Sequence, residues 1–183
     1  LMALNYSCGN VPNDMEYKEY IDLFEQKELP YSLDSTFIRS TTEKSQSSID
    51  TADIAEFFES NREFGGGVTL FDVYRYYPHF QFSIDDNITA EVIEKVGGAG
   101  GVEKMFYLIT YSKGGKIIDK ALLAKEIGDC SRLQVWTGEI SKDFEINVTQ
   151  KLFKGDCETE EYRLESTKKE SYKLTNEGKI TTP

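Results

Sequence analysis

The stretch Phe144-Glu145-Ile146-Asn147-Val148-Thr149-Gln150-Lys151-Leu152 shows the clearest alternation of apolar and polar residues in this chain. Such alternation is typical of a β-strand with one buried face, because successive side chains of a strand point to opposite sides. The stretch 105–111 is apolar on both faces, which predicts a central strand. Further runs of this kind cover residues 71–77, 80–82, 88–93, 117–123, 133–136 and 162–174. Strands this short, separated by turn residues, predict a mainly β fold with an antiparallel sheet.

Turns that contain glycine connect the predicted strands. Lys113-Gly114-Gly115-Lys116 and Asn176-Glu177-Gly178-Lys179 both place glycine where a hairpin needs a positive φ angle. The glycine runs 65–67 and 97–101 are interpreted as hairpin loops, because neither has the sequence context of a phosphate-binding loop. Consecutive strands usually lie side by side. We therefore predict an antiparallel meander, or an up-and-down barrel-like sheet that is open or closed.

Residues 9–64 precede these strands and follow a different pattern. Asn13 and Glu16 have the spacing of a helix-capping box, and the apolar residues after them recur at helical intervals. Asp50 is a candidate N-cap for a second short helix. Residues 41–48 are polar without apolar spacing, which is typical of a loop or linker. We expect one or two short N-terminal helices that pack onto the sheet.

The overall composition restricts the classes of partner. The 183 residues are 39% hydrophobic and 29% charged, as in a globular protein with a core. The formal net charge is −11, and no basic patch with interleaved aromatic residues offsets it, so we expect no nucleic-acid partner. No run reaches the roughly 18 apolar residues that a transmembrane helix needs. Attachment to a membrane would therefore depend on a modified residue.

Residues that carry catalysis or bind metals are scarce. His79 is the only histidine, and nothing around it marks a Ser-His-Asp or Cys-His site. A zinc site of ordinary ligands is not expected with one histidine. The acidic runs 85–87 and 156–161 lack the spacing of a calcium-binding EF-hand loop, so we interpret them as solvated turns. We predict no catalytic residue, no metal site and no cofactor.

Aromatic residues are plentiful, with 11 Tyr, 11 Phe and one Trp. In a sheet of this size most of them belong to the core or to cross-strand pairs. Exposed ones could instead stack on sugar rings or line a cavity for an apolar ligand. The candidates for such a binding surface are Trp136, Tyr74, Tyr76 and Tyr77.

Cys8 lies in a segment that resembles the end of a bacterial lipoprotein signal peptide. It follows a short apolar run and Ser7, and it precedes Gly9. Asn5, three residues before the cysteine, departs from the pattern, which prefers an aliphatic residue there. We expect residues 1–8 to be a truncated signal that ends at a lipidated Cys8.

The other two cysteines, Cys130 and Cys157, each lie within a Gly-Asp-Cys tripeptide. An even pair is what an oxidising compartment would use as a disulfide. In a meander, alternate loops emerge at the same end of the sheet, and neighbouring strands lie ~5 Å apart. That spacing is compatible with a disulfide between the two loops, so we predict a Cys130–Cys157 bond.

Several phrases of the sequence together resemble one group of proteins. They are Ser7-Cys8, Leu29-Pro30-Tyr31, the hairpin 111–119, the Gly-Asp-Cys loops and the closing run 176–180. In these features the chain resembles uncharacterised Bacteroidota-type lipoproteins with a C-terminal β-meander. The resemblance implies attachment to the cell envelope and a β-meander, and it implies no activity.

These observations predict a lipid-anchored protein of the bacterial cell envelope that faces the periplasm or the cell surface. Its parts would be the signal 1–8, a helical and linker segment 9–64, and an antiparallel β domain 65–183. We favour a non-enzymatic binding or structural module with a protein or glycan partner, attached to the membrane through Cys8. The alternative is a β-barrel carrier of a small apolar ligand, and a hydrolase with an unrecognised site comes third.

Overall fold

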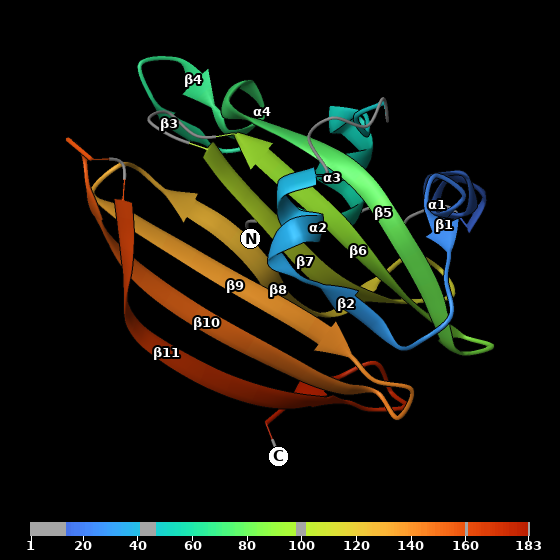
Figure 1. Ribbon diagram of the computed structural model, residues 1–183. Coiled ribbons are helices and arrows are strands. Elements are labelled where there is room, and N and C mark those ends of the chain that lie inside the picture. Colours follow the sequence, from blue (N-terminus) through green and yellow to red (C-terminus); the bar gives the residue numbers. More distant parts are fainter. Residues whose placement is uncertain (1–13, 41–46, 98–101, 160, 183) are drawn as a thin grey trace, which may run out of the picture.

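The structure is a computed structural model that describes residues 14–40, 47–97, 102–159 and 161–182. It is mainly β, as predicted, and strands β5 to β11 follow one another as an antiparallel meander (Figure 1). Their bounds are Tyr74–Asp85 (β5), Ile88–Gly97 (β6), Val102–Ser112 (β7), Ile117–Gly128 (β8), Arg132–Ile140 (β9), Glu145–Asp156 (β10) and Glu161–Leu174 (β11). The central position predicted for the strand at 105–111 is confirmed, since β7 lies between β6 and β8.

Short strands complete the sheet. β1 (Glu25–Gln26) pairs in parallel with β5, β12 (Ile180–Thr181) pairs with β11, and β2 (Tyr31–Leu33) pairs with β9. The order of the sheet runs from β1 to β12, so the sheet is open rather than a closed barrel. β3 (Glu63–Gly65) and β4 (Val68–Thr69) form a separate hairpin.

Strand β5 differs from the sequence prediction at its start and at Pro78. Leu70–Val73 form helix α4 rather than the start of a strand, and the backbone N–H of Thr69 donates to Asp72 at 2.8 Å. β5 then continues through Pro78, so the runs predicted separately before and after this proline belong to one strand. The register between β5 and β6 shifts between Pro78 and Phe80, and a proline, which has no N–H, is tolerated at such an irregularity.

The predicted glycine turns are confirmed where the structure describes them. Gly115 and Gly178 have φ angles of 76° and 77°, which side chains with a Cβ rarely adopt. Gly65, Gly66 and Gly67 also have positive φ, and Gly66 and Gly67 form the turn between β3 and β4. Of the glycine run 97–101, only Gly97 is among the described residues.

The sheet divides where β8 and β9 separate. The first half of β9 pairs with residues 125–128 of β8, whereas its second half, Gly138 to Ile140, pairs with β2. A Cβ on Gly138 would lie 2.4 Å from the carbonyl oxygen of Leu123, so glycine allows β9 to pass this close to β8. Figure 1 shows β9–β11 turned away from β5–β8, with α2 (Ser35–Ser40) and β2 in front of the opening.

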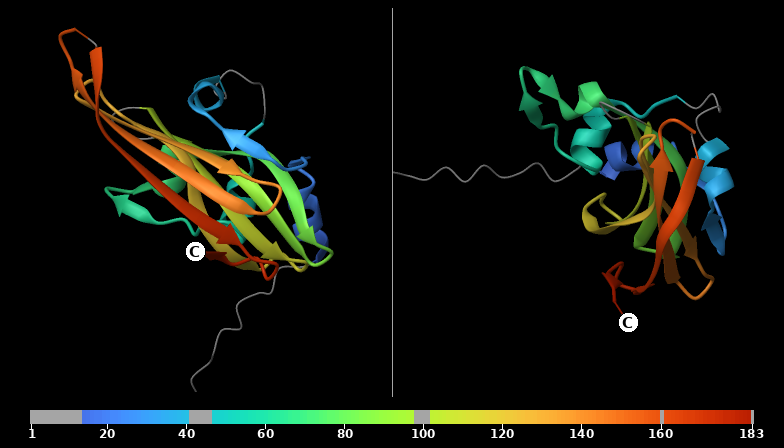
Figure 2. Two further views of the ribbon diagram at one scale, coloured as in Figure 1. Left: turned by 60° about the horizontal axis from the view of Figure 1, so that its bottom comes forward. Right: turned by 60° about the vertical axis from the view of Figure 1, so that its left-hand side comes forward.

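Two apolar cores lie on opposite faces of β5–β7. α1 (Asp14–Ile21) and α3 (Thr51–Phe57) cover one face, and α2 and β2 lie on the other side of the sheet (Figure 2). The first core, between the two halves of the sheet, contains Leu33, Ile38, Phe80, Phe82, Ala90, Val92, Phe106, Leu108, Leu123, Ala124, Ile140, Ile146, Val148 and Leu174. The second, under α1 and α3, contains Tyr17, Tyr20, Phe24, Ile49, Ile54, Phe57, Phe58, Tyr76, Ile93, Ile109 and Tyr111.

The described part of the segment 9–64 is built into the same fold as residues 65–183. β1 and β2 belong to the main sheet, and α1, α2 and α3 contribute side chains to the two cores. The N-cap at Asp50 is confirmed, because its carboxylate accepts the backbone N–H of Ala52 at 2.8 Å. The predicted cap at Asn13, most of the linker 41–48, and the signal 1–8 with Cys8 lie outside the described residues. Among the described helices, none has the length and apolar character needed to span a bilayer.

Candidate functional site

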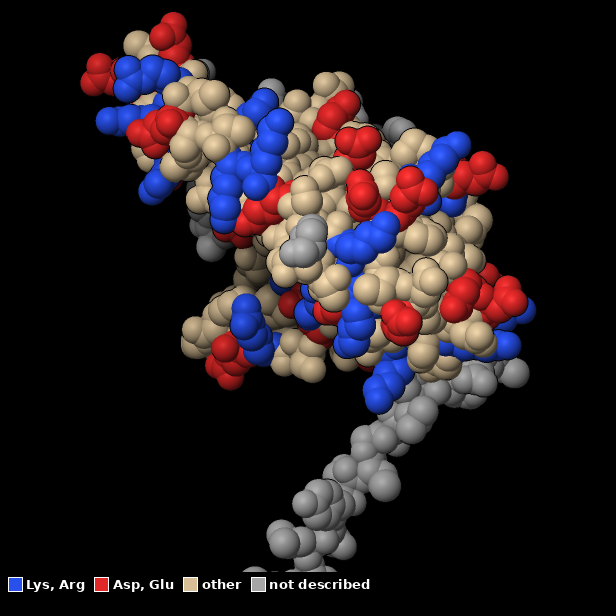
Figure 3. All heavy atoms as spheres, turned by 90° about the horizontal axis from the view of Figure 1, so that it is seen from below, with Lys and Arg blue, Asp and Glu red and all other residues tan. Residues whose placement is uncertain are grey.

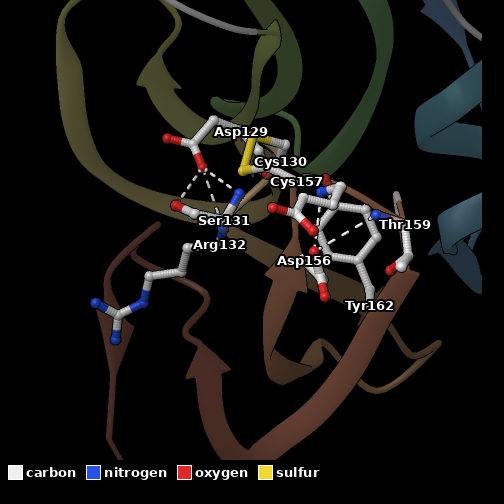
Figure 4. Close-up of a disulfide and its surroundings, with 9 residues drawn as sticks. Asp129, Cys130, Ser131, Arg132, Asp156, Cys157, Thr159 and Tyr162 are labelled. Atoms are coloured by element: carbon white, nitrogen blue, oxygen red, sulfur yellow. Dashed lines mark hydrogen bonds between the residues drawn. A yellow bond between two sulfur atoms is a disulfide. The ribbon is translucent and has the colours of Figure 1, made fainter.

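The predicted disulfide between Cys130 and Cys157 is confirmed (Figure 4). Cys130 lies in the turn between β8 and β9, and Cys157 lies in the turn after β10, so both turns emerge at one end of the sheet as the meander required. Their Cα atoms are 4.8 Å apart, and 27 positions separate them in the sequence. Disulfides of this kind are typical of proteins from oxidising compartments.

The aspartate of each Gly-Asp-Cys tripeptide holds its turn. Asp129 accepts hydrogen bonds from the hydroxyl of Ser131 at 2.7 Å and from its backbone N–H at 2.8 Å, and these bonds hold the pKa of Asp129 below its usual value. Asp156 accepts the backbone N–H of Glu158 at 2.9 Å. The hydroxyl of Tyr162 in β11 donates to the carbonyl of Asp129 at 2.8 Å. The disulfide therefore joins two turns that are already ordered by their own hydrogen bonds.

A depression of about 490 Å³ lies beside this disulfide at the end of β10 and β11. Its lining combines acidic, basic and aromatic side chains: Lys154, Gly155, Asp156, Cys157, Thr159, Glu161, Tyr162 and Arg163. Tyr162 is 44% exposed, so its ring is available at the surface. The mixed charges give this depression no preference for an anion or a cation.

Trp136, the only tryptophan, lies in a second depression, of about 260 Å³, on strands β9–β11. It pairs across the sheet with Lys125 of β8 and with Gln150 of β10. The Nζ atom of Lys125 lies 4.1 Å from the centre of the indole ring, a cation–π contact. Burial lowers the pKa of Lys125. The other lining residues are Arg132, Gln134, Lys151, Leu152, Ser166 and Lys168.

Several polar groups around Trp136 are free to bind a ligand. The side chains of Gln134, Arg132 and Ser166 have no hydrogen-bond partner among the described residues. Gln150 donates its amide N–H to Glu170 at 2.7 Å, which leaves its amide oxygen free to accept. Lys168 in the lining is ion-paired with Glu170 at 2.5 Å, so the guanidinium of Arg132 is the better candidate for binding an anionic group.

The predicted tyrosine candidates do not join this site. Tyr76 is 1% exposed and donates its hydroxyl to Glu59 at 2.7 Å, so it is a core residue and not a ligand contact. Burial raises its pKa well above the usual value. Tyr74 is partly exposed and lines a separate depression of about 340 Å³ near residues 48–51. Tyr77 is half-buried on β5, a strand that is not a neighbour of β9.

His79 forms an enclosed pair with Glu94 rather than an open catalytic site. The Nε2 atom of His79 and Oε2 of Glu94 are 2.8 Å apart, and their side chains are 9% and 3% exposed. The rings of Phe37 and Phe106 pack against the imidazole. No group of three or more His, Cys, Asp or Glu side chains that could hold a metal ion occurs within the described ranges.

A buried carboxyl group, that of Glu91 in β6, was not among the residues predicted from the sequence. Glu91 is fully buried, and its Oε1 atom lies 2.7 Å from the hydroxyls of both Tyr20 and Tyr111. Burial raises the pKa of Glu91 to about 8. Tyr111 also donates to the carbonyl of Phe57 at 2.6 Å. The single hydroxyl hydrogen of Tyr111 is used in that bond. The contact between Tyr111 and Glu91 is therefore a hydrogen bond when the carboxyl group of Glu91 is protonated and donates.

The sequence carried a signal for this group, because Glu91 lies between the apolar residues Ala90 and Val92 and shares its face of the strand with Ile93. A charged residue in a central strand is costly to bury unless it is neutral or hydrogen-bonded. Its partners come from α1 and β7, which only the folded chain brings together. The cluster is enclosed within the second core, so it does not form a surface site.

A scan against protein-family models, a search of curated proteins and a search of solved structures each found no match to this chain.

Proposed function

We propose that this protein is a non-enzymatic binding module of the bacterial cell envelope, and that its Trp136 depression binds a glycan. The observation that carries this proposal is the set of unpaired polar groups around the indole ring, namely the side chains of Arg132, Gln134 and Ser166 and the amide oxygen of Gln150. The C–H faces of a sugar ring pack on the electron-rich face of an indole, while its hydroxyls need hydrogen-bond donors and acceptors at the rim. The guanidinium of Arg132 favours a sugar that carries a carboxylate or a sulfate.

The packing of the first core favours a binding site on the surface over one inside the sheet. Leu33 of β2 and Ile38 of α2 are fully buried between the two halves of the sheet, where a carrier would hold its ligand. Side chains thus fill the space that the alternative function, a β-barrel carrier, needs to be open. The concave strands β9–β11 instead present their polar groups to solvent beside Trp136.

Trp136 is expected to report directly on ligand binding. Because it is the only tryptophan, its fluorescence should change on titration with oligosaccharides, and uronic-acid oligosaccharides should bind more tightly than neutral chito-oligosaccharides. By calorimetry, W136A should weaken binding by roughly tenfold or more, as expected for a central aromatic contact. R132Q should weaken binding of the acidic probes more than that of the neutral ones.

A matched control is Phe64→Ala, which removes an aromatic ring that is 53% exposed on the β3–β4 hairpin. This variant should bind as the unmodified protein does. Unchanged affinity in W136A, or an equal loss in both variants, would assign the binding to another surface and would contradict the proposal. The glycan proposal would also be rejected if no oligosaccharide bound and a protein ligand bound at Trp136 instead.

The envelope location rests on Cys8 and is supported by the disulfide, since disulfides persist in oxidising compartments. We expect the intact mass of protein purified from its native membranes to show cleavage before Cys8 and the addition of acyl chains. C8S should remain unprocessed and lose its membrane association. An unmodified, uncleaved Cys8 in the native protein would contradict the anchor without affecting the Trp136 site.

A further inference from the structure

Three basic side chains lie next to one another near the end of strands β9–β11. Lys154 of β10 pairs with Arg132 of β9 on one side and with Arg163 of β11 on the other. Directly opposed residues of neighbouring strands point to the same face of a sheet. All three residues are exposed, and their side chains have no hydrogen bond or ion pair with any described residue. We call Arg132, Lys154 and Arg163 the basic row.

The basic row lies on the same face of the sheet as Trp136. Arg132 and Trp136 are four positions apart on β9, and alternate residues of a strand share a face. No register shift interrupts the pairing of β9 with β10, so the relation holds on both strands. At about 3.3 Å per residue, the basic row is ~13 Å from Trp136 along the strand. A ligand that contacts both must therefore be a chain of several sugars.

The positions between the basic row and Trp136 are neutral, and those beside Trp136 are neutral or basic. The middle row across the three strands consists of Gln134, Leu152 and Ser166. The cross-strand neighbours in the row of Trp136 are Lys125, Gln150 and Lys168. None of these described positions is acidic, although Lys168 is ion-paired with Glu170. Elsewhere both signs occur, since Figure 3 shows acidic and basic side chains interspersed on the projecting end of the molecule.

The basic row is unfavourable for folding by itself. Like charges directly opposite one another destabilise an antiparallel pair, and Lys154 faces a basic residue on both sides. The row does not reflect a general excess of basic residues, because Asp and Glu outnumber Lys and Arg by 32 to 21 in this chain. The next row towards the disulfide pairs Asp156 with Glu161, which limits the basic surface on that side. An anion bound along the basic row would neutralise its repulsion.

We propose that the basic row is a second subsite for the glycan, and that the ligand is a polysaccharide with acidic groups on successive sugars. One sugar packs on Trp136, and carboxylates or sulfates further along the same chain bind the basic row. The amide of Gln134 and the hydroxyl of Ser166 face the sugar hydroxyls between them. This inference rests on the proposed function, because it takes the sugar at Trp136 as its starting point.

A single-stranded nucleic acid is also a polyanion, but it fits this surface less well. Proteins hold such strands with several aromatic side chains, on which successive bases stack. The three rows contain one aromatic residue, Trp136. Tyr162 directly precedes Arg163 on β11 and therefore points to the other face of the sheet. The neutral amide and hydroxyl groups of the middle row suit the hydroxyls of a sugar chain better.

The test is calorimetric titration with mono-, di-, tetra- and hexagalacturonate, a heparin-derived tetrasaccharide and neutral chitotetraose. The affinity for galacturonates should rise steeply once the chain is long enough to reach the basic row, and it should fall as the salt concentration rises. K154Q and R163Q should each weaken binding of the acidic tetrasaccharides about threefold, and K154Q/R163Q about tenfold. Binding of chitotetraose should stay unchanged in these variants. Either acidic probe supports the proposal, and the tighter one identifies the acidic group.

Lys169→Gln is the matched control, because it removes one positive charge from an exposed residue on the other face of β11. This variant should bind every probe as the unmodified protein does. The second subsite is overturned, with the Trp136 site intact, if the acidic tetrasaccharides bind no more tightly than chitotetraose or bind K154Q/R163Q with unchanged affinity. If no oligosaccharide binds, the proposed function fails and this inference fails with it. A single-stranded oligonucleotide that binds more tightly than both acidic tetrasaccharides would overturn the polysaccharide as the ligand.

Discussion

The variant Glu91→Gln should lose most of the pH dependence of stability that the unmodified protein shows between about pH 5 and pH 8. Glu91 is enclosed in the second core with the hydroxyls of Tyr20 and Tyr111, and burial raises its pKa to about 8 from 4.5. Glutamine has nearly the same shape but carries no titratable proton. We expect E91Q to resemble the unmodified protein near pH 5 and to be more stable at pH 9.

The direction of this pH effect on stability follows from the number of protons that the folded and unfolded states bind. The folded state holds the Glu91 proton more tightly than the unfolded state does, since the folded pKa is the higher one. The stability that depends on this proton is fully present below about pH 4.5 and is lost as the pH rises through about 8. The slope is at most about 1.4 kcal/mol per pH unit, so the whole range corresponds to about 4–5 kcal/mol.

Urea unfolding of both proteins at pH 5, 6, 7, 8 and 9 measures this effect. The difference between the two free energies of unfolding isolates Glu91 from all other titrating groups. E139Q is a control, because it makes the same substitution at an exposed residue of β9 and should leave the pH profile unchanged. Parallel profiles for E91Q and the unmodified protein would show that Glu91 is ionised in the folded state and that the assigned pKa is wrong.

Removing the disulfide should have the second largest effect on stability. C130S/C157S opens a link across 27 positions of the sequence, and the loop-entropy model assigns about 3–4 kcal/mol to a link of this length. The end of β10–β11 should also become more mobile, because its side chains pack little: residues 161–169 of β11 are exposed on both faces. Hydrogen exchange in residues 153–163 should therefore rise more than in β6 and β7.

Thermal and urea unfolding of C130S/C157S and of the oxidised protein give the loss directly. Addition of a reductant to the unmodified protein should reproduce it. C8S is the matched control, since it removes the one cysteine that does not belong to the disulfide. A double variant as stable as C8S would show that the hydrogen bonds of Asp129 and Tyr162 hold the two turns without the covalent bond.

The parts of the fold that could be predicted from the sequence are those set by local patterns. The alternation at 144–152 and the glycine turns at Gly115 and Gly178 define β10 and two hairpins without reference to distant residues. The disulfide followed from the same pattern, because a meander fixes which loops share an end. The placement of β2 beside β9 had no such signal, since nothing local distinguishes Tyr31–Leu33 from a loop.

The candidate site was predicted only in part, for a related reason. Trp136 could be singled out by residue type, but its contact with Lys125 and its unpaired neighbours depend on the pairing of β8, β9 and β10. Tyr76 has the same sequence features as an exposed aromatic residue of a strand. Its burial follows from α3, which covers that face of β5 and brings Phe58 and Glu59 against it.

The pairing of β2 with β9 has a consequence for the order in which the chain folds. Leu33 lies beside Gly138, so the contact joins residues from the first and last thirds of the sequence. Contacts this far apart form late, because a long loop must close before they contribute any free energy. During synthesis, Leu33 and Ile38 lack the part of their cover that β9 supplies until residue 140 has left the ribosome. Until then this side of the first core stays open to contacts with other chains, as the exposed apolar surface of a partly folded protein does.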